Sequence, residues 1–248
     1  SLLRNDIYKM ITCLETQAEL LKKDKIYLAD SLSDISHQLK TPMTSMMVMT
    51  DILGDETLPP DRRAEFTSAI RSQLERMEWL LTALLKMSRL DAGTVQFRRE
   101  PELAAQLIRT AAAHLLIPME LKSQTFEVRV PENLEILCDR SWTAEAISNI
   151  LKNCMEHTPE GGAITVTGEE RGIYSSLIIE DTGEGIAPED VPHIFERFYR
   201  GKNAGKDSVG IGLAMAKNIL NMQNAHVEAE SEQGRGTRFF IRFYRKVI

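Results

Sequence analysis

One long stripe of apolar side chains at helical spacing runs through the first forty residues. Its members step along the chain alternately by four and three residues, the a/d pattern of a helix that packs along a narrow seam against a partner. They are Ile7, Ile11, Leu14, Ala18, Leu21, Leu28, Leu32, Ile35 and Leu39, with Lys25 as the one break. The N-terminal third is therefore constrained to a helical, bundle-like or coiled-coil structure.

A second helix is predicted after the turn-forming segment 55–60, with Asp61 as its cap. Its apolar stripe comprises Phe66, Ile70, Leu74, Met77, Leu81 and Leu84. A hairpin of two amphipathic helices cannot cover its own stripe, so we expect a homodimer that forms a four-helix bundle. Met43, Met46, Met47 and Met49 are read as core-filling residues rather than as a functional methionine patch. Gly93 is predicted to end the second helix and to begin a hinge.

Short β-rich runs alternate with helices beyond this hinge. The pattern predicts an α+β sandwich with one sheet face covered by helices. Strands are expected at 94–99, 126–130, 136–138, 163–168, 175–180, 227–231 and 237–244, and helices from about 102, over 141–156 and from about 212. The predicted organisation is an N-terminal signalling helix (1–30), a dimerisation domain (31–93) and a ligand-binding domain (94–248).

Charge and cysteine content narrow the possible partners of the 248-residue chain. Thirty basic and 36 acidic residues give a net charge of −6, without a basic cluster, so no nucleic acid is expected as a partner. Cys13, Cys138 and Cys154 form no CxxC pair, which favours a reducing compartment. The sequence contains no apolar run of about 20 residues and no signal peptide. A chain that begins at Ser1 is compatible with a fragment of a longer protein.

His37 lies off the apolar stripe, so its ring is expected to face solvent. A lone histidine on a helix is most often a plain surface residue, but its neighbours here suggest chemistry. Thr41 follows four residues later on the same helical face. Pro42 removes the helical donor for the carbonyl of Gln38, which predicts a kink just past the imidazole.

Three glycine clusters and a pair of asparagines mark the C-terminal half. Asp181 follows an apolar strand, and Gly183 and Gly185 let the backbone approach a planar ligand closely. Gly210 and Gly212 open a helix whose N-terminus favours phosphate. The third cluster, residues 234–237, is a turn between the last two strands. Each cluster alone is weak evidence, and neither a Walker P-loop nor a strand-coupled G-x-G-x-x-G is present.

The asparagines Asn149 and Asn153 lie one turn apart on a predicted helix. Their side-chain oxygens can coordinate magnesium, and their amides can bind phosphate without adding negative charge. Taken alone, such a pair more often consists of solvent-exposed residues without a binding function.

Together, these motifs resemble those of a bacterial two-component sensor histidine kinase, from about Ser31 onward. Six segments match in order: 37–42 the H box, 149–159 the N box, 181–187 the first glycine box, 195–200 the F box, 210–213 the second glycine box and 234–239 the third. The resemblance implies a HisKA dimerisation and phosphotransfer domain, followed by a Bergerat-type sandwich shared with gyrase-like and Hsp90-like ATPases.

The resemblance also implies residue roles. Asp181 would accept a hydrogen bond from the adenine amino group, Asn153 would hold magnesium, and Asn149 and His157 would support the phosphates. Residues 201–209 would form a lid over the nucleotide. The remaining expected ATP-site residues are Gly183, Gly185, Phe195, Arg200, Gly210, Gly212, Leu213 and Thr237, with Lys202 and Lys206 as further candidate cations. Phe195 and Phe198 could dock the lid region, although Phe198 is equally explained as a core aromatic.

The implied reaction is attack by neutral His37 on the γ-phosphate of ATP, then transfer to an aspartate of a partner response regulator. Thr41 resembles the residue that orients a water for dephosphorylation of the regulator. By the same resemblance, the chain would be the cytoplasmic part of a membrane-anchored sensor, and the seam before residue 31 would transmit a stimulus through helix packing.

Two positions depart from the family pattern. The residue after the histidine, usually acidic, is Gln38, which cannot act as a base, so phosphatase activity could dominate. Glu156 stands where the N box is often basic, and its charge would weaken ATP binding unless it points away.

Two alternative functions stay open. A gyrase-like or chaperone-like ATPase shares the sandwich, but Asn149 stands where those enzymes carry the glutamate that activates water. A nucleotide-sensing dimeric scaffold without catalysis is supported only by Gln38.

Overall fold

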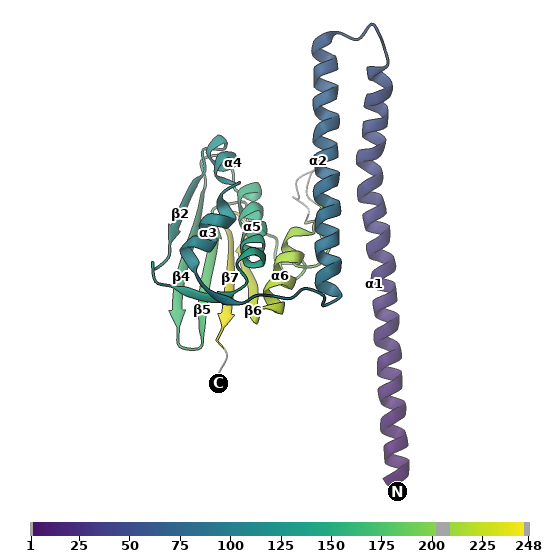
Figure 1. The fold of residues 1–248 in the computed structure, drawn as a ribbon, viewed down its shortest axis with the longest axis vertical. Coiled ribbons are helices and arrows are strands. Elements are labelled where there is room, and N and C mark those ends of the chain that lie inside the picture. Colours follow the sequence, from purple (N-terminus) through teal and green to yellow (C-terminus); the bar gives the residue numbers. More distant parts are fainter. Residues whose placement is uncertain (1, 202–208, 246–248) are drawn as a thin grey trace. The chain divides into compact units, whose positions relative to one another are not determined.

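The computed structural model describes residues 2–201 and 209–245 of the chain (Figure 1). It divides into two compact units, Ser1–Leu80 and Leu81–Ile248. The boundary falls within the second helix, so the last turns of that helix belong to the second unit. Over the described residues, none of the helices is both long and apolar enough to cross a bilayer.

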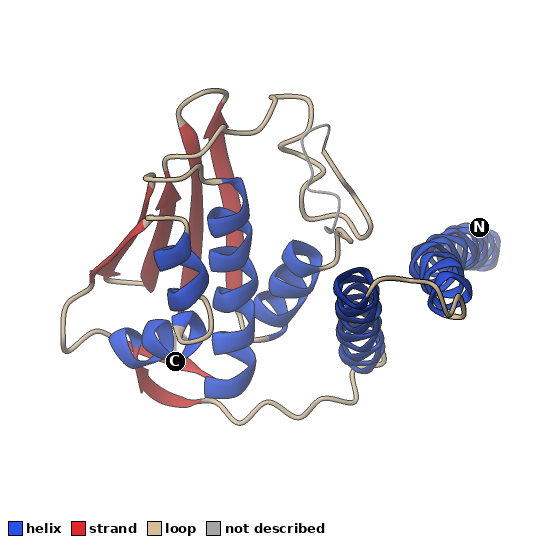
Figure 2. Cartoon of the chain, turned by 90° about the horizontal axis from the view of Figure 1, so that it is seen from above, coloured by secondary structure: helices blue, strands red, loops and turns tan. Residues whose placement is uncertain are grey.

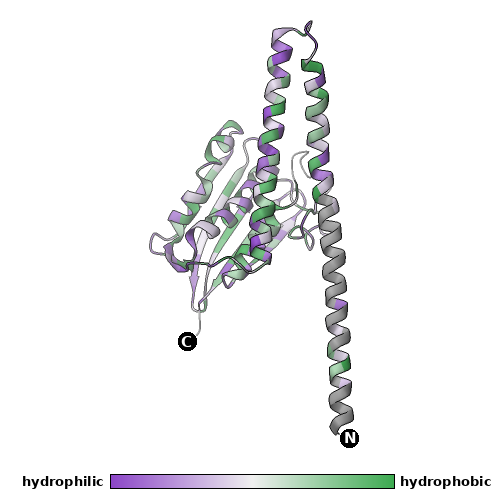
Figure 3. Ribbon diagram, turned by 45° about the vertical axis from the view of Figure 1, so that its right-hand side comes forward, coloured by the Kyte–Doolittle hydropathy of each residue, from purple (hydrophilic) through white to green (hydrophobic). Residues whose placement is uncertain are grey.

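The first unit is a helical hairpin formed by α1 (Leu2–Leu53) and most of α2 (Pro60–Asp91). Arg63 closes the hairpin, because its guanidinium donates to the carbonyls of Leu53 at 2.8 Å and Asp55 at 2.9 Å. These contacts satisfy carbonyls near the C-terminal end of α1, which lack helical donors. Apolar residues recur along α2 and along the part of α1 nearest the turn (Figure 3).

The predicted seam is only partly described. Ile11 is exposed, and Ile35 and Leu39 are half-buried. The other seam side chains lie outside the described residues, so the packing of this seam against a partner stays a prediction. They are those of Ile7, Leu14, Ala18, Leu21, Lys25, Leu28 and Leu32.

The second unit contains a five-stranded sheet in the order β2-β4-β5-β7-β6, in which only the β2–β4 pair is parallel. Strands β1 and β3 form a separate antiparallel pair. The strands are β1 (Glu100–Leu103), β2 (Thr125–Arg129), β3 (Glu135–Cys138), β4 (Ala163–Arg171), β5 (Tyr174–Asp181), β6 (Ala225–Glu232) and β7 (Gly236–Tyr244).

Helices cover one face of the five-stranded sheet (Figures 1 and 2). They are α3 (Ala104–Ala112), α4 (Leu116–Leu121), α5 (Arg140–His157) and α6 (Gly212–Met222). The core between the two layers is apolar and fully buried. It includes Leu107, Ile147, Ile150, Leu151, Ile164, Leu177, Ile179 and Phe239. Burial of these side chains from both layers is the main stabilising contribution to the sandwich, and it confirms the predicted fold class.

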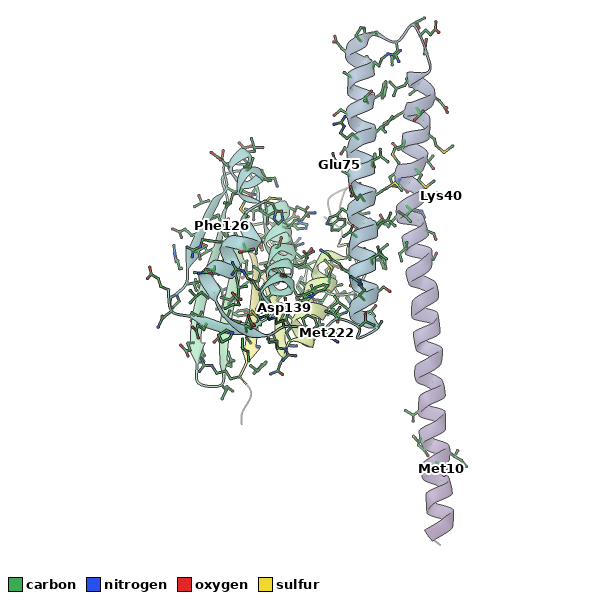
Figure 4. All side chains as sticks on the ribbon, in the orientation of Figure 1. Met10, Lys40, Glu75, Phe126, Asp139 and Met222 are labelled. Carbon is green, nitrogen blue, oxygen red and sulfur yellow. The ribbon has the colours of Figure 1, made fainter. Side chains whose placement is uncertain are left out.

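Polar contacts fix the segment that leads from α2 into this domain. Asp139 caps α5 through the amides of Ser141 and Trp142, and it also accepts a hydrogen bond from the amide of Arg98 at 3.0 Å. The Arg99 guanidinium donates to the carbonyl of Met222 at 2.8 Å. Figure 4 labels Asp139 and Met222, at the ends of α5 and α6. The residues just before β1 are therefore hydrogen-bonded to the N-terminus of α5 and to the C-terminus of α6.

Several predicted boundaries were wrong. Segment 94–99 is not a strand: Cys138, the last residue of β3, pairs with Glu100, and the chain then turns into α5 at Arg140, so β3 cannot pair with residues before Glu100. The next helix begins at Ala104 rather than near residue 102. Helix α4 was not predicted. α2 begins at Pro60, so Asp61 lies in its first turn instead of capping it.

Candidate functional site

The exposed ring of His37 lies on α1, as predicted. The hydroxyl of Thr41 donates to the carbonyl of His37 at 3.2 Å, which confirms that the two residues share a helical face. This bond uses the only hydroxyl proton of Thr41, so its lone pairs stay available to accept a hydrogen bond from water. Gln38 is half-buried. Pro42 is buried and does not end the helix, since α1 continues past it to Leu53.

Asp181 lies at the end of β5 and is only 3% exposed. Its Oδ1 accepts hydrogen bonds from the amides of Gly183 at 2.9 Å and Thr237 at 3.2 Å. Burial raises the pKa of Asp181, while these two amides, the thiol of Cys154 and the nearby His157 oppose that rise. The carboxyl group is thus held in a fixed orientation at a buried position, which suits recognition of a polar group on an otherwise apolar ligand.

At three positions around Asp181 the backbone of another segment is so close that only glycine fits. A Cβ on Gly183 would lie 2.5 Å from the carbonyl oxygen of His157, and one on Gly185 would lie 2.2 Å from that of Glu232. A Cβ on Gly236 would lie 1.9 Å from the carbonyl oxygen of Asp181 itself. The first and third glycine clusters therefore pack directly against each other.

The second glycine cluster begins α6. Gly210 has a φ of +75°, and its carbonyl accepts a hydrogen bond from the amide of Phe198 at 2.8 Å. A Cβ on Gly212 would lie 3.0 Å from Oδ1 of Asn149, whose Nδ2 donates to the carbonyl of Glu145 at 2.9 Å. The missing side chain at Gly212 thus lets the amide of Asn149 approach the N-terminus of α6, where unpaired N–H groups favour an anion.

Asn149, Asn153 and His157 follow one another at intervals of one turn on α5, and all three are half-buried. Nδ1 of His157 lies 3.2 Å from Oε1 of Glu184 in the first glycine cluster. An amide oxygen such as that of Asn153 is a suitable ligand for magnesium. Glu156 is exposed and lies 3.8 Å from the ammonium of Lys152.

The structure gives the following positions for the remaining residues that were predicted to bind ATP. The ring of Phe195 packs edge-on against Phe239 of β7, with centroids 6.3 Å apart, and Nζ of Lys217 lies 5.3 Å from its centroid. Leu213 is half-buried in the first turn of α6, and Thr237 is buried. Arg200 is exposed. Lys202, Lys206 and most of the predicted lid lie outside the described residues.

Two residues near Asp181 were not predicted. The thiol of Cys154 is fully buried, and its pKa is raised by burial and by the nearby Asp181 carboxylate. The hydroxyl of Ser231 contacts three groups from the first and third glycine clusters. Only the position of Cys154, directly after Asn153, could have drawn attention to it. Nothing in the local sequence around Ser231 indicates its contact with Ile186, although the predicted turn between the last two strands could have indicated its proximity to residues 236–237.

Comparison with known proteins assigns families to both parts of the chain. Residues 27–93 match the "His Kinase A (phospho-acceptor) domain", and residues 138–246 match the "Histidine kinase-, DNA gyrase B-, and HSP90-like ATPase". The sensor histidine kinase YclK of Bacillus subtilis is 29% identical over 215 residues, which make up 85% of this chain and 45% of that protein. The chain thus spans less than half the length of this relative.

Two solved structures share the fold. Full-length ShkA in complex with AMPPNP is 24% identical, with a TM-score of 0.63, over 86% of this chain and 45% of that one. Histidine kinase ThkA in complex with the response regulator TrrA is 18% identical, with a TM-score of 0.73, over 88% of this chain and 61% of that one. The two matched domains follow one another in this order and together cover most of the chain, and with the relative YclK they show that the chain belongs to the bacterial sensor histidine kinase family.

Proposed function

We propose that the chain is an ATP-dependent protein histidine kinase that phosphorylates His37 and passes the phosphoryl group to an aspartate of a response regulator. The observation that carries the proposal is the buried Asp181 carboxyl group inside a glycine cradle, on a chain that also exposes His37. The relatives named as sensor kinases and the ThkA–TrrA complex support it.

The residues around Asp181 fit an adenine nucleotide. Asp181 offers a carboxylate oxygen for the adenine amino group, and the glycines leave no side chain between backbone and base. Asn149 and the N-terminus of α6 suit the phosphates, with His157 nearby on the same face of α5. The AMPPNP in ShkA is consistent with this assignment.

Asn153 would hold magnesium, which would neutralise charge between the phosphates when bound. Of the basic residues near the lid, Arg200 is the described candidate to stabilise the transferring group.

In the phosphorylation step, a neutral imidazole nitrogen of His37 attacks the γ-phosphorus. The new P–N bond forms as the bond to the bridging oxygen breaks, and ADP leaves. The imidazole must also lose a proton. Gln38 cannot accept it, because a neutral amide is not a base, so the exposed ring would release the proton to solvent. We therefore expect slow autophosphorylation, and a phosphatase activity for which the acceptor lone pairs of Thr41 orient water.

The active form is proposed to be a homodimer in which two hairpins form a four-helix bundle. Large apolar side chains on the first unit are exposed in the single chain, among them Met43, Met47, Val48, Ile52 and Leu74. Pairing with a second copy would bury them. We further propose that the chain is the cytoplasmic part of a membrane-anchored sensor, since it covers under half of a relative named as a sensor kinase.

Incubation with γ-labelled ATP and magnesium tests the proposal. We expect an acid-labile label on the wild-type chain, no label on His37→Ala, and normal labelling of the control His226→Ala, a half-buried histidine on β6. Release of free phosphate without any label would favour an ATPase instead. Bound nucleotide with neither product would favour a non-catalytic scaffold.

A further inference from the structure

Ser231, at the end of β6, connects the two glycine clusters that surround Asp181. Its Oγ accepts a hydrogen bond from the amide of Ile186 at 2.8 Å. The same oxygen lies 2.9 Å from the carbonyl oxygen of Gly236 and 3.0 Å from Oγ1 of Thr237. One hydroxyl thus contacts the loop after β5 and the first two residues of β7.

The number of protons available decides the direction of these bonds. The hydroxyl of Ser231 has one proton, and the carbonyl of Gly236 can only accept it. The contact between Ser231 and Thr237 therefore needs the proton of the Thr237 hydroxyl. With that proton directed to Ser231, Oγ1 of Thr237 keeps only lone pairs for any further partner.

Thr237 lies beside the carboxyl group of Asp181. Its backbone amide donates to Oδ1 of Asp181 at 3.2 Å, and the residue is only 6% exposed. At the buried end of β5, the hydroxyl oxygen and the ionised carboxylate are thus both hydrogen-bond acceptors. A pair of acceptors suits a base with an amino group, such as adenine, and repels the carbonyl oxygen that guanine has at the same position.

We infer that Ser231 is a positioning residue that directs the Thr237 hydroxyl proton away from the base, and that it thereby determines selectivity for an amino-purine over an oxo-purine. This inference rests on the proposed binding of the adenine base at Asp181. Ser231 acts through Thr237 and the loop at Ile186, without touching the nucleotide itself.

The test measures dissociation constants for ADP and GDP with the full 248-residue chain, by competition against a fluorescent ADP analogue. Both diphosphates lack the transferable group, so binding is separated from chemistry. Ser231→Ala frees the Thr237 proton to point toward the base. The preference for ADP over GDP should then fall about five- to tenfold, the equivalent of one lost hydrogen bond.

Two comparisons separate this role from general stabilisation. Ser175→Ala removes the hydroxyl of a buried serine of this domain, which lies 3.3 Å from the carbonyl oxygen of Glu135, and should leave the preference unchanged. Thr237→Val removes the hydroxyl through which Ser231 acts and should lower the preference by itself. Adding Ser231→Ala to Thr237→Val should then have no further effect on the preference.

An unchanged preference in Ser231→Ala, or additive effects of the two substitutions, would overturn the inference. Should Ser231→Ala fail to fold, an unchanged preference in Thr237→Val would overturn it equally. If Asp181→Asn leaves ADP binding intact, the proposed nucleotide site itself is wrong. If Asp181→Asn abolishes binding while Ser231→Ala keeps the preference, only the role of Ser231 is wrong.

Discussion

Asp91, in the last turn of α2, and Arg197, directly before Phe198, form a bidentate ion pair. Nη1 of Arg197 lies 2.7 Å from Oδ2 of Asp91, and Nη2 lies 2.5 Å from Oδ1. Asn218 of α6 donates to the same carboxylate at 3.0 Å. One side chain of α2 therefore binds both segments that flank the predicted lid, 106 and 127 residues farther along the chain.

A double-mutant cycle with Asp91→Ala and Arg197→Ala should give a favourable coupling of about 0.5–1 kcal/mol. The value is modest because Asp91 is 40% exposed, and it should decrease at high salt. Urea unfolding of the four proteins provides the measurement. The exposed pair Arg62 and Glu65 is the control and should give a smaller coupling. Equal coupling energies in the two pairs would show that the bidentate geometry at Asp91 does not strengthen the ion pair.

Asp181→Asn should separate stability from binding. Burial raises the pKa of Asp181, so in a pH window above the ordinary value of 3.8 the native state holds a proton that the unfolded chain has lost. Native stability therefore falls as pH rises through this window, and an uncharged amide avoids the loss. We expect a melting temperature about 2–4 °C higher than that of the wild type at pH 8, and no difference well below the window.

The same substitution should weaken ADP binding about 100-fold, because Nδ2 of the amide replaces an acceptor by a donor. In the wild type, affinity should decrease as pH falls through the raised pKa of Asp181, while Asp181→Asn should lose this dependence. Thermal unfolding and ADP titration over a series of pH values test both statements. A variant that is less stable than the wild type at pH 8 would contradict the assigned cost of burying the charge.

Gly234, in the turn between β6 and β7, and Gly236, the first residue of β7, should respond very differently to substitution by alanine. Gly236 has a φ of +107°, and its Cβ would lie 1.9 Å from the carbonyl oxygen of Asp181. Gly234 has a φ of +82°, but its Cβ would meet nothing within 4 Å. Gly234→Ala should cost only about 1–2 kcal/mol for the left-handed backbone. Gly236→Ala should cost clearly more and abolish ADP binding. Similar costs in urea unfolding would contradict the close packing of the two glycine clusters.

Gln38→Glu should accelerate autophosphorylation by about tenfold or more, since a carboxylate beside His37 can accept its proton. Gln38→Ala is the matched control and should leave the rate close to that of the wild type. Initial rates of label incorporation at saturating ATP provide the measurement. If Gln38→Ala slows the reaction as much as Gln38→Glu was expected to accelerate it, the glutamine itself takes part in catalysis.

The sequence predicted those features that depend on local patterns. The apolar periods predicted both long helices, and Gly93 ends α2 as expected, with a φ of +62° and its amide bonded to the carbonyl of Leu90. Segment 94–99 has the composition of a strand, yet none of the strands in the described part of the chain pairs with it. Instead, Phe97 packs against Trp142, with ring centroids 5.9 Å apart. Helix α4 has only six residues and contains Pro118, so it carries almost no periodic signal.

In the candidate site, too, the sequence predicted the residues that belong to local motifs and missed those that depend on contacts with other segments. Asp181, the glycines and the asparagines of α5 stand out because their residue types and spacing are unusual. Ser231 was missed because its contact with Ile186 joins positions 45 residues apart. Cys154 was missed because it lies far along the chain from Asp181. The ring of Phe195, expected at the nucleotide, packs against Phe239. Its contact with ATP stays a prediction, since the lid beside it lies outside the described residues.

Peptide mapping after incubation with ATP and magnesium tests the central proposal most directly. Digestion after lysine releases residues 26–40, in which His37 is the only histidine. We predict that this peptide gains the mass of one phosphoryl group at neutral pH, that fragmentation places the group on His37, and that brief acid treatment removes it. A phosphoryl group found only on another residue, or none on this peptide while the chain binds and turns over ATP, would contradict the proposal.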